Sequence, residues 1–212
     1  CSADDCSQLA ADADGMNPDG QALLVRVLAD RRASAHFGLI EKLCGAGDAG
    51  LRLTAYEALA RMARPDDVEK VLNLLSKAGA PAETEAAQKA LISLYQQKNH
   101  PESRIILSAL ASGNQKEKLI PVLPWLNDKN ALKSVTTLLK SGSTAEKAAA
   151  FKALAGWNGS SALPALYEIF AANNSFRNEA LGAYLSQVNR AGIPDDQMLL
   201  WLDKIMEKCT TS

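Results

Sequence analysis

Three glycines with the spacing of a nucleotide-binding loop lie in the segment CGAGDAG, at Gly45, Gly47 and Gly50. In dinucleotide-binding proteins the spacing G-x-G-x-x-G works only between a buried strand and the N-terminus of a helix, where the backbone approaches a pyrophosphate. Here the flanking residues follow helical periodicity on both sides, and no strand pattern precedes the glycines. We therefore interpret the segment as a junction at which Gly45 or Gly47 ends one helix and Asp48 starts the next, and we predict no cofactor.

Other residues that could do chemistry are few and scattered. The two histidines, His36 and His100, fall near the starts of different helices. Stacked helices lie about 8–10 Å apart, so these rings are too far apart to share a zinc ion with bonds of about 2.0 Å. No H-E-x-x-H, G-x-S-x-G or P-loop pattern is present. Acid pairs such as Asp66-Asp67 and Asp195-Asp196 stand at helix starts, where carboxylates cap exposed N–H groups. We predict no catalytic residues and no metal site.

The four cysteines are Cys1, Cys6, Cys44 and Cys209, and none forms a C-x-x-C pair. Two interpretations of Cys44 remain open, namely a disulfide with Cys6 or a free and partly buried thiol. The opening CSADDC also looks like the mature end of a bacterial lipoprotein. A lipid anchor at Cys1 therefore stands beside the alternative of a simple chain boundary.

The composition is that of an ordinary globular protein, with 47% hydrophobic, 22% charged and 5% aromatic residues. Alanine and leucine, both strong helix formers, are abundant. A formal net charge of −1 argues against a dedicated nucleic-acid binder, which needs a basic field to displace counterions from phosphates. No run of about 18 apolar residues is present, so we expect no transmembrane span.

A repeat of 31–32 residues runs through most of the chain. Leucines recur at this interval, and we call them the reference leucines. Four residues before, one residue before and three residues after each reference leucine, nearly every residue is apolar, and Arg31 is the one polar exception in those columns. These offsets lie on one side of an α-helix. The reference leucines are Leu28, Leu59, Leu91, Leu123, Leu154 and Leu185.

Each repeat contains a second helical pattern, such as PDDVEKVLNLL at 65–75, and no segment shows strand alternation. Pro121 and Pro124 should interrupt the first helix of the fourth repeat, and Pro164 should kink or shorten the second helix of the fifth. Glycine in the left-handed conformation commonly ends helices. We expect this role at the repeat junctions, at Gly45 or Gly47, Gly79, Gly113 and Gly142, and for the pair Asn173-Asn174.

A helical pair of this length cannot bury its apolar stripe alone, so neighbouring pairs must stack. The A-x-x-A-L core of the first helix and the P-D-D-V-x-x-V-L-x-L-L opening of the second resemble the HEAT-repeat family in its short bacterial form, over roughly residues 20–208. We expect an all-α fold, a right-handed α-α superhelix of about six helical hairpins. An N-terminal segment, a short helix or a lipoprotein-type linker, would occupy 1–19, with the repeat domain at 20–212. The repeat units are predicted near 20–47, 48–80, 81–113, 114–143, 144–174 and 175–212.

Basic residues gather at the turns between the two helices of successive repeats, where stacking would align them along one edge. This basic edge could meet an acidic partner, or its side chains could simply complement helix C-termini. We interpret the tryptophans Trp125, Trp157 and Trp201 as core, Trp157 above all. The basic edge comprises Arg31, Arg32, Arg61, Arg64, Lys98 and Lys129.

The function most consistent with these features is a non-enzymatic module that binds a protein or peptide. The resemblance also implies an alternative, a spacer or docking region of a larger bacterial cell-envelope protein whose carbohydrate-processing or other catalytic domain lies elsewhere. A periplasmic or cell-envelope location is therefore slightly favoured over the cytoplasm. A helical-repeat enzyme such as a DNA glycosylase is disfavoured by the near-neutral charge.

Overall fold

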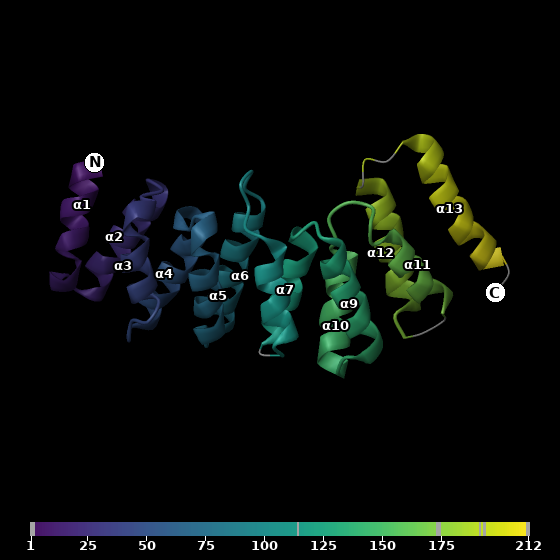
Figure 1. The fold of residues 1–212 in the computed structure, drawn as a ribbon, viewed down its shortest axis with the longest axis horizontal. Helices are drawn as coiled ribbons and strands as arrows, with labels where there is room; N and C mark the ends of the chain where they lie inside the picture. Colours follow the sequence, from purple (N-terminus) through teal and green to yellow (C-terminus); the bar gives the residue numbers. More distant parts are fainter. Residues whose placement is uncertain (1–2, 114, 173–174, 191, 193, 211–212) are drawn as a thin grey trace. The chain divides into compact units, whose positions relative to one another are not determined.

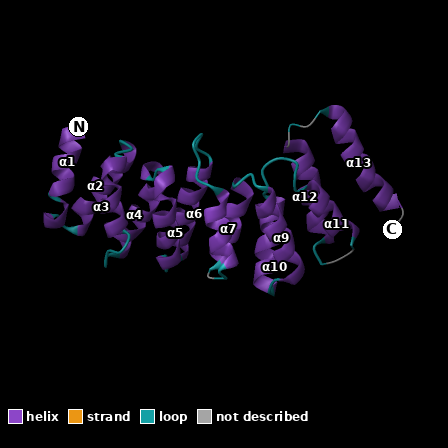
Figure 2. Cartoon of the chain, viewed as in Figure 1, coloured by secondary structure: helices purple, strands orange, loops and turns teal. Residues whose placement is uncertain are grey.

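The computed structural model describes residues 3–113, 115–172, 175–190, 192 and 194–210. Within these residues the chain is helical and contains no strand (Figures 1 and 2). The predicted all-α class is confirmed. The helices cluster into two compact units, Cys1–Val122 and Leu123–Ser212. None of the described helices is both long enough and apolar enough to cross a membrane.

The first unit begins with a short helix and continues with helices that follow one another as pairs. Its first helices α2, α4 and α6 pack successively on one another, while α3 packs on α4 and α5 packs on α6. Its elements are α1 (Ala3–Ala11), η1 (Ala13–Gly15), α2 (Pro18–Asp30), η2 (Ser34–His36), α3 (Phe37–Leu43), α4 (Ala49–Met62), η3 (Pro65–Asp67), α5 (Val68–Lys77), α6 (Pro81–Tyr95), α7 (Ser103–Ala111) and α8 (Lys116–Leu119).

The second unit shows the same kind of packing. Helix α9 packs on α10, α10 packs on α12, and α11 lies against α12 over much of its length. Its elements are the end of η4 (Ile120–Trp125), followed by α9 (Lys129–Ser141), α10 (Thr144–Ala155), α11 (Leu163–Ala171), α12 (Arg177–Arg190) and α13 (Asp195–Thr210).

Helix starts carry the capping chemistry that the sequence predicts. Asp48 precedes α4, and its carboxylate accepts a hydrogen bond from the N–H of Leu51 at 2.8 Å, as expected for the N-cap of the helix that follows the glycine segment. At η3 the Asp67 carboxylate instead reaches back to the N–H of Arg64 at 3.0 Å. Both contacts satisfy backbone donors that a helix start leaves without an intrahelical partner.

The prolines of the fourth repeat act as predicted. Helix α8 lasts only four residues, and the chain continues through η4 as a 3-10 helix that contains Pro121 and Pro124. Proline has no N–H to donate and clashes with the preceding turn, so a regular α-helix cannot pass through this segment. Pro164 instead lies in the first turn of α11, where it shortens the helix by setting its start and causes no kink.

The glycine prediction is correct at one junction and wrong at most others. Gly113 has a φ of +83°, whereas Gly45, Gly47, Gly79 and Gly142 are not left-handed. The chain instead leaves these helices through residues with negative φ, because the next helix begins almost at once. Gly142, for example, is extended and is followed directly by Ser143, the N-cap of α10.

Gly142 is required for a different reason, since a Cβ there would lie 2.5 Å from the carbonyl oxygen of Leu138 and 2.9 Å from the Cβ of Glu146. The predicted pair Asn173-Asn174 lies outside the described residues.

The apolar stripe of the first helices forms the core. The first five reference leucines, Leu28 to Leu154, are fully buried, at 0% exposure. Trp157 is 4% exposed, so its predicted core position is confirmed, while Trp125 and Trp201 are half-buried. Arg31, the polar exception in the stripe, is exposed.

Hydrogen bonds between neighbouring first helices repeat with nearly the same spacing along the sequence. Five of them join residues 30 to 33 positions apart, which is close to the interval between reference leucines. These bonds run from Arg61 to Asp30, from Arg52 to Glu83, from Gln88 to the carbonyl of Lys118, from Ser93 to the carbonyl of Ala60, and from Gln187 to the carbonyl of Leu154.

Candidate interaction surface

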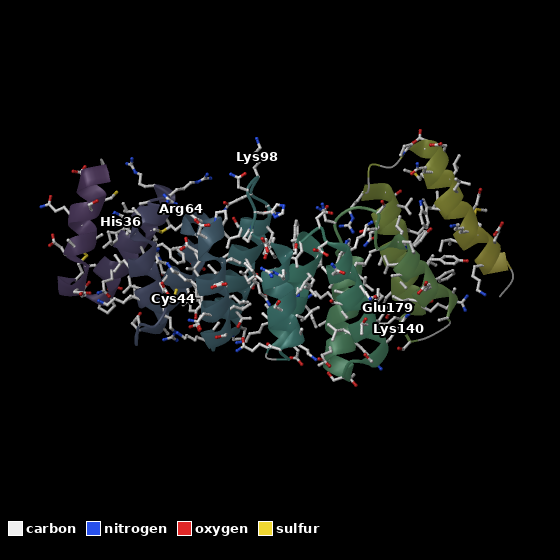
Figure 3. All side chains as sticks on the ribbon, in the orientation of Figure 1. His36, Cys44, Arg64, Lys98, Lys140 and Glu179 are labelled. Atoms are coloured by element: carbon white, nitrogen blue, oxygen red, sulfur yellow. The ribbon has the colours of Figure 1, made fainter. Side chains whose placement is uncertain are left out.

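Five of the six predicted basic-edge residues belong to the first unit, and all five are exposed. They lie at or just beyond the C-terminal ends of first helices, as predicted. Figure 3 shows Arg64 and Lys98 on the same margin of this unit. Lys129 is also exposed, but it is the first residue of α9 in the second unit. The candidate surface is therefore confined to the first unit.

Backbone geometry explains why arginines can occupy the end of α2. The N–H of Arg31 donates to the carbonyl of Val27 at 3.1 Å and closes the last turn. Arg32 then takes a left-handed φ of 51°, which ends the helix and turns the chain toward η2. Cationic side chains at this end complement the partial negative charge of the helix C-terminus.

A hollow between α2 and α4 adjoins this edge, with a volume of about 410 Å³. Val25, Ala29 and Ala58 line it with buried apolar side chains. Thr54 also contributes, and its hydroxyl donates to the carbonyl of Gly50 at 2.9 Å. These four residues are small, so the backbone of α2 and α4 lies close to the hollow. Four charged residues complete the lining, namely Arg26 and Asp30 from α2 and Glu57 and Arg61 from α4.

An ion pair between Arg61 and Asp30 joins α4 to α2 beside the hollow. Both side chains are more than half exposed, so water screens their attraction, and the net contribution of such pairs to stability is about 0–1 kcal/mol. The pair can therefore open at little cost when a competing charge arrives. Arg26 and Glu57 lie one helical turn earlier on α2 and α4, and within the described residues no ion pair joins them.

A buried ion pair holds α4 against α6 beneath this surface. Glu83 is 4% exposed and accepts the Nε–H of Arg52 at 2.7 Å, as well as the N–H groups of Gly79 and Ala80. Burial by itself raises the pKa of Glu83, but the hydrogen bonds from Arg52, Ala80 and Gly79 outweigh it and lower the pKa below 4.5. Arg52 also donates to the carbonyl of Ala46, so one side chain ties the glycine segment to the next helix.

Cys44 lies next to this network and behaves as a core residue. Burial, together with the charges of Glu41 and Glu83, raises the pKa of its thiol to about 12. Such a thiol carries almost no thiolate near neutral pH and is a poor nucleophile. Cys6 and Cys44 are both free and buried, so of the two open interpretations the free thiol is the one observed. Cys1 and the side chain of Cys209 lie outside the described residues.

A second hollow, of about 330 Å³, lies between α5, α7 and α8. Lys118 stands near it and donates through Nζ to the carbonyls of Leu75 at 3.2 Å and Ala78 at 2.8 Å. These contacts cap the C-terminal carbonyls of α5 with a cation, which is a structural role. We therefore do not assign this hollow to the interaction surface.

Neither histidine belongs to a cluster that could bind a metal, and the described part of the chain holds no such cluster. His36 is half-buried, and its Nε2 lies 3.5 Å from the hydroxyl of Ser7. His100 is exposed in the loop after α6, where its Nδ1 lies 3.0 Å from the carbonyl of Pro101.

Sequence reasoning found the basic edge, including Arg61, but missed the other charged residues of the adjoining hollow, Arg26, Asp30 and Glu57. Arg26 and Glu57 stand two residues before their reference leucines, and Asp30 and Arg61 stand two residues after. A comparison of the positions two residues before and two residues after each reference leucine would have shown opposite charges on neighbouring helices, Arg26 with Glu57 and Asp30 with Arg61. A comparison with protein-family models finds no match, and a search of curated proteins finds no significant similarity.

Proposed function

We propose that this protein is a non-enzymatic interaction module of six helical hairpins, resembling HEAT repeats and stacked as a superhelix. Three features support the repeat architecture. First helices pack on first helices within each unit, the second helix of one pair packs on the first helix of the next, and hydrogen bonds recur between residues 30 to 33 apart. Stacked repeats present long continuous surfaces suited to protein partners.

The binding site in this proposal is the first-unit edge formed by Arg31, Arg32, Arg61, Arg64 and Lys98, together with the hollow between α2 and α4. The observation that carries it is the exposure of Arg31, Arg32 and Arg64 just beyond the C-terminal ends of α2 and α4, the two helices that line the hollow. Arginine pairs bidentately with carboxylates. We therefore infer that the partner supplies an extended acidic segment whose carboxylates meet the arginines.

The test is affinity capture with the full chain and two charge-reversal variants. The first variant carries Arg31→Glu, Arg32→Glu and Arg64→Glu, which spares the ion pair between Arg61 and Asp30. The matched control carries Lys133→Glu, Lys140→Glu and Lys152→Glu, three exposed lysines of the second unit, and so has the same net charge. We expect the control to retain the partners of the wild type and the first variant to lose them.

Salt dependence provides a second readout of the same site. Contacts between exposed charges weaken as ionic strength rises, because the screening length falls from about 10 Å at 0.1 M to about 3 Å at 1 M. Capture by the wild type should therefore decline with salt. If the Arg31, Arg32 and Arg64 variant captures the same partners as the wild type, the proposed edge is wrong.

A further inference from the structure

The hollow between α2 and α4 carries charged side chains at two levels along the helices. At the level nearer the C-terminal ends, Asp30 of α2 and Arg61 of α4 form an ion pair. One turn earlier, Arg26 and Glu57 line the hollow from the same two helices, again 31 residues apart in the sequence. Both are exposed, and within the described residues no ion pair joins them. An ion pair therefore bridges α2 and α4 at one level of the hollow, while the charges of the other level stay separate.

Glu57 differs from the other unpaired charges of this site. Among the charged side chains of the hollow and the first-unit edge, those without an ion pair in the described part of the chain are cations, with the single exception of Glu57. These cations are Arg26, Arg31, Arg32, Arg64 and Lys98. Arg61 lies four residues after Glu57, a spacing at which a helix can form an ion pair, but its guanidinium pairs with Asp30 instead. Glu57 is thus the one acid of this set that is left to meet a ligand.

An acidic segment that binds the first-unit edge and continues into the hollow must pass Glu57. A carboxylate at this level is attracted by Arg26 but is repelled by the like charge of Glu57. A basic side chain beside Glu57 replaces this repulsion by an attraction. In an extended chain successive side chains point to opposite sides. One residue of the segment can therefore face Arg26 on α2 while its neighbour faces Glu57 on α4.

The distance from this level to the first-unit edge sets the spacing of the segment. Arg31 lies five residues after Arg26, which is about 7.5 Å along α2 at a rise of about 1.5 Å per residue. An extended chain covers about 7 Å in two residues. The acid that faces Arg26 and the acid that meets the edge are therefore two positions apart. The residue that faces Glu57 stands directly beside the first of these acids, at the end of the acidic run.

We propose that Glu57 selects a lysine or arginine at one end of the acidic segment that the partner supplies. The segment has the form Lys-Glu-Glu-Glu, in which the basic side chain faces Glu57 and the adjacent carboxylate faces Arg26. The remaining carboxylates meet the arginines of the first-unit edge. This inference rests on the proposed function, because it specifies the partner of the same site. It adds a requirement that the edge alone does not impose, namely a positive charge in a segment that is otherwise negative.

Two fluorescein-labelled peptides with blocked termini test the inference, Gly-Lys-Glu-Glu-Glu-Gly and Gly-Gln-Glu-Glu-Glu-Gly. Their affinities for the full-length chain are measured by fluorescence anisotropy at low ionic strength, where screening is weak. General attraction to the basic edge favours the glutamine peptide, because that peptide carries one more net negative charge. We expect the opposite order, with the lysine peptide binding about threefold more tightly, as for one exposed ion pair.

Variants at Glu57 show whether this residue causes the preference. Glu57→Gln should abolish the advantage of the lysine peptide, and Glu57→Lys should reverse it in favour of the glutamine peptide. The matched control is Glu117→Gln on α8, which removes the same charge from another exposed glutamate of the first unit and should keep the threefold preference. Both glutamates are exposed, so these substitutions leave the buried core unchanged.

Failure of this inference and failure of the proposed function give different results. If the wild type binds both peptides but does not prefer the lysine peptide, and the Arg31, Arg32 and Arg64 charge-reversal variant binds neither, the basic edge stands and selection by Glu57 is wrong. Selection by Glu57 is also wrong if the preference survives in Glu57→Gln. If the wild type binds neither peptide, or the charge-reversal variant binds both as the wild type does, the proposed edge is wrong and this inference fails with it.

Discussion

The first and the last helix pairs of this protein differ in what covers them. In the first unit, α1 and η1 pack beside α2, with Cys6 and Ala13 at most 4% exposed. Asp14 accepts from Lys42 of α3 at 2.7 Å, and Gln21 of α2 donates to the carbonyl of Ala13 at 2.9 Å. In the second unit the last pair leaves leucines uncovered. The first pair is thus covered by α1 and η1, whereas Leu199 and Leu200 of α13 are 62% and 64% exposed among the described residues.

The polar contacts inside the two units differ in the same direction. Glu83 in the first unit is buried and has three hydrogen-bond donors. Gln187 in the second unit is 1% exposed, and its Oε1 has no hydrogen-bond partner among the described residues. Buried polar groups stabilise a fold only when they are satisfied. The comparison predicts that replacing the buried Glu83 lowers the free energy of unfolding strongly, whereas replacing the buried Gln187 changes it little.

The largest expected effect is that of Glu83→Ala. This change leaves Arg52 partly buried without its carboxylate and removes the acceptor for the N–H groups of Gly79 and Ala80. Removing one partner of a buried ion pair commonly costs 3–5 kcal/mol, and the partial exposure of Arg52 reduces the cost, so we expect a loss of about 3 kcal/mol in urea denaturation. The control is Glu85→Ala on the same helix, where water screens the exposed pair with Lys89 and we expect stability to stay close to that of the wild type.

The pH dependence of this effect follows from the lowered pKa of Glu83. A carboxyl whose folded pKa is depressed contributes stability above its unfolded pKa, and that contribution is lost as the pH falls through the folded value. The difference in unfolding free energy between the wild type and Glu83→Gln should therefore be constant near neutral pH and shrink below about pH 4.5. A difference that grows on acidification would contradict the assigned shift.

Removal of residues 1–16 should have the next largest effect. It exposes the side of the first pair that α1 and η1 cover, and removes the burial of Cys6 and Ala13. The gain in chain entropy offsets part of this loss, so we expect destabilisation of about 2 kcal/mol. Hydrogen exchange should show lost protection in α2 and α3 but not in α12. Uniform loss across both units would contradict the view of α1 as a local cover.

The helical class, the prolines of the fourth repeat, the Asp48 cap and the buried position of Trp157 were predictable because each depends on local sequence or on a regular column of residues. The left-handed glycines were predicted wrongly at most junctions, because the next helix starts too soon to allow that turn. The hollow beside Arg61 was missed, because it depends on which charges face one another across α2 and α4. Periodicity alone gives the buried side of each helix, not the pairing of its exposed residues.

The smallest effect, and the sharpest test of the comparison, is expected for Gln187→Met. The Gln187 amide donates to the carbonyl of Leu154, but that carbonyl also accepts the N–H of Trp157 at 3.1 Å and so keeps a partner after the substitution. The change also removes the buried Oε1, whose desolvation opposes folding by about 1–3 kcal/mol. These terms nearly cancel, so we expect a shift within about 1 kcal/mol, toward greater stability.

Gln187→Ala is the control for packing at this site, because it removes side-chain volume and should cost about 2 kcal/mol. If Gln187→Met costs as much as Glu83→Ala in urea denaturation, the amide oxygen must be satisfied in solution, and the contrast between the two units fails. If Gln187→Met is neutral or stabilising, the contributions of Glu83 and Gln187 to stability differ in the way that their hydrogen bonds indicate. Glu83 then holds α4 and α6 together, whereas Gln187 occupies a position that an apolar side chain fills equally well.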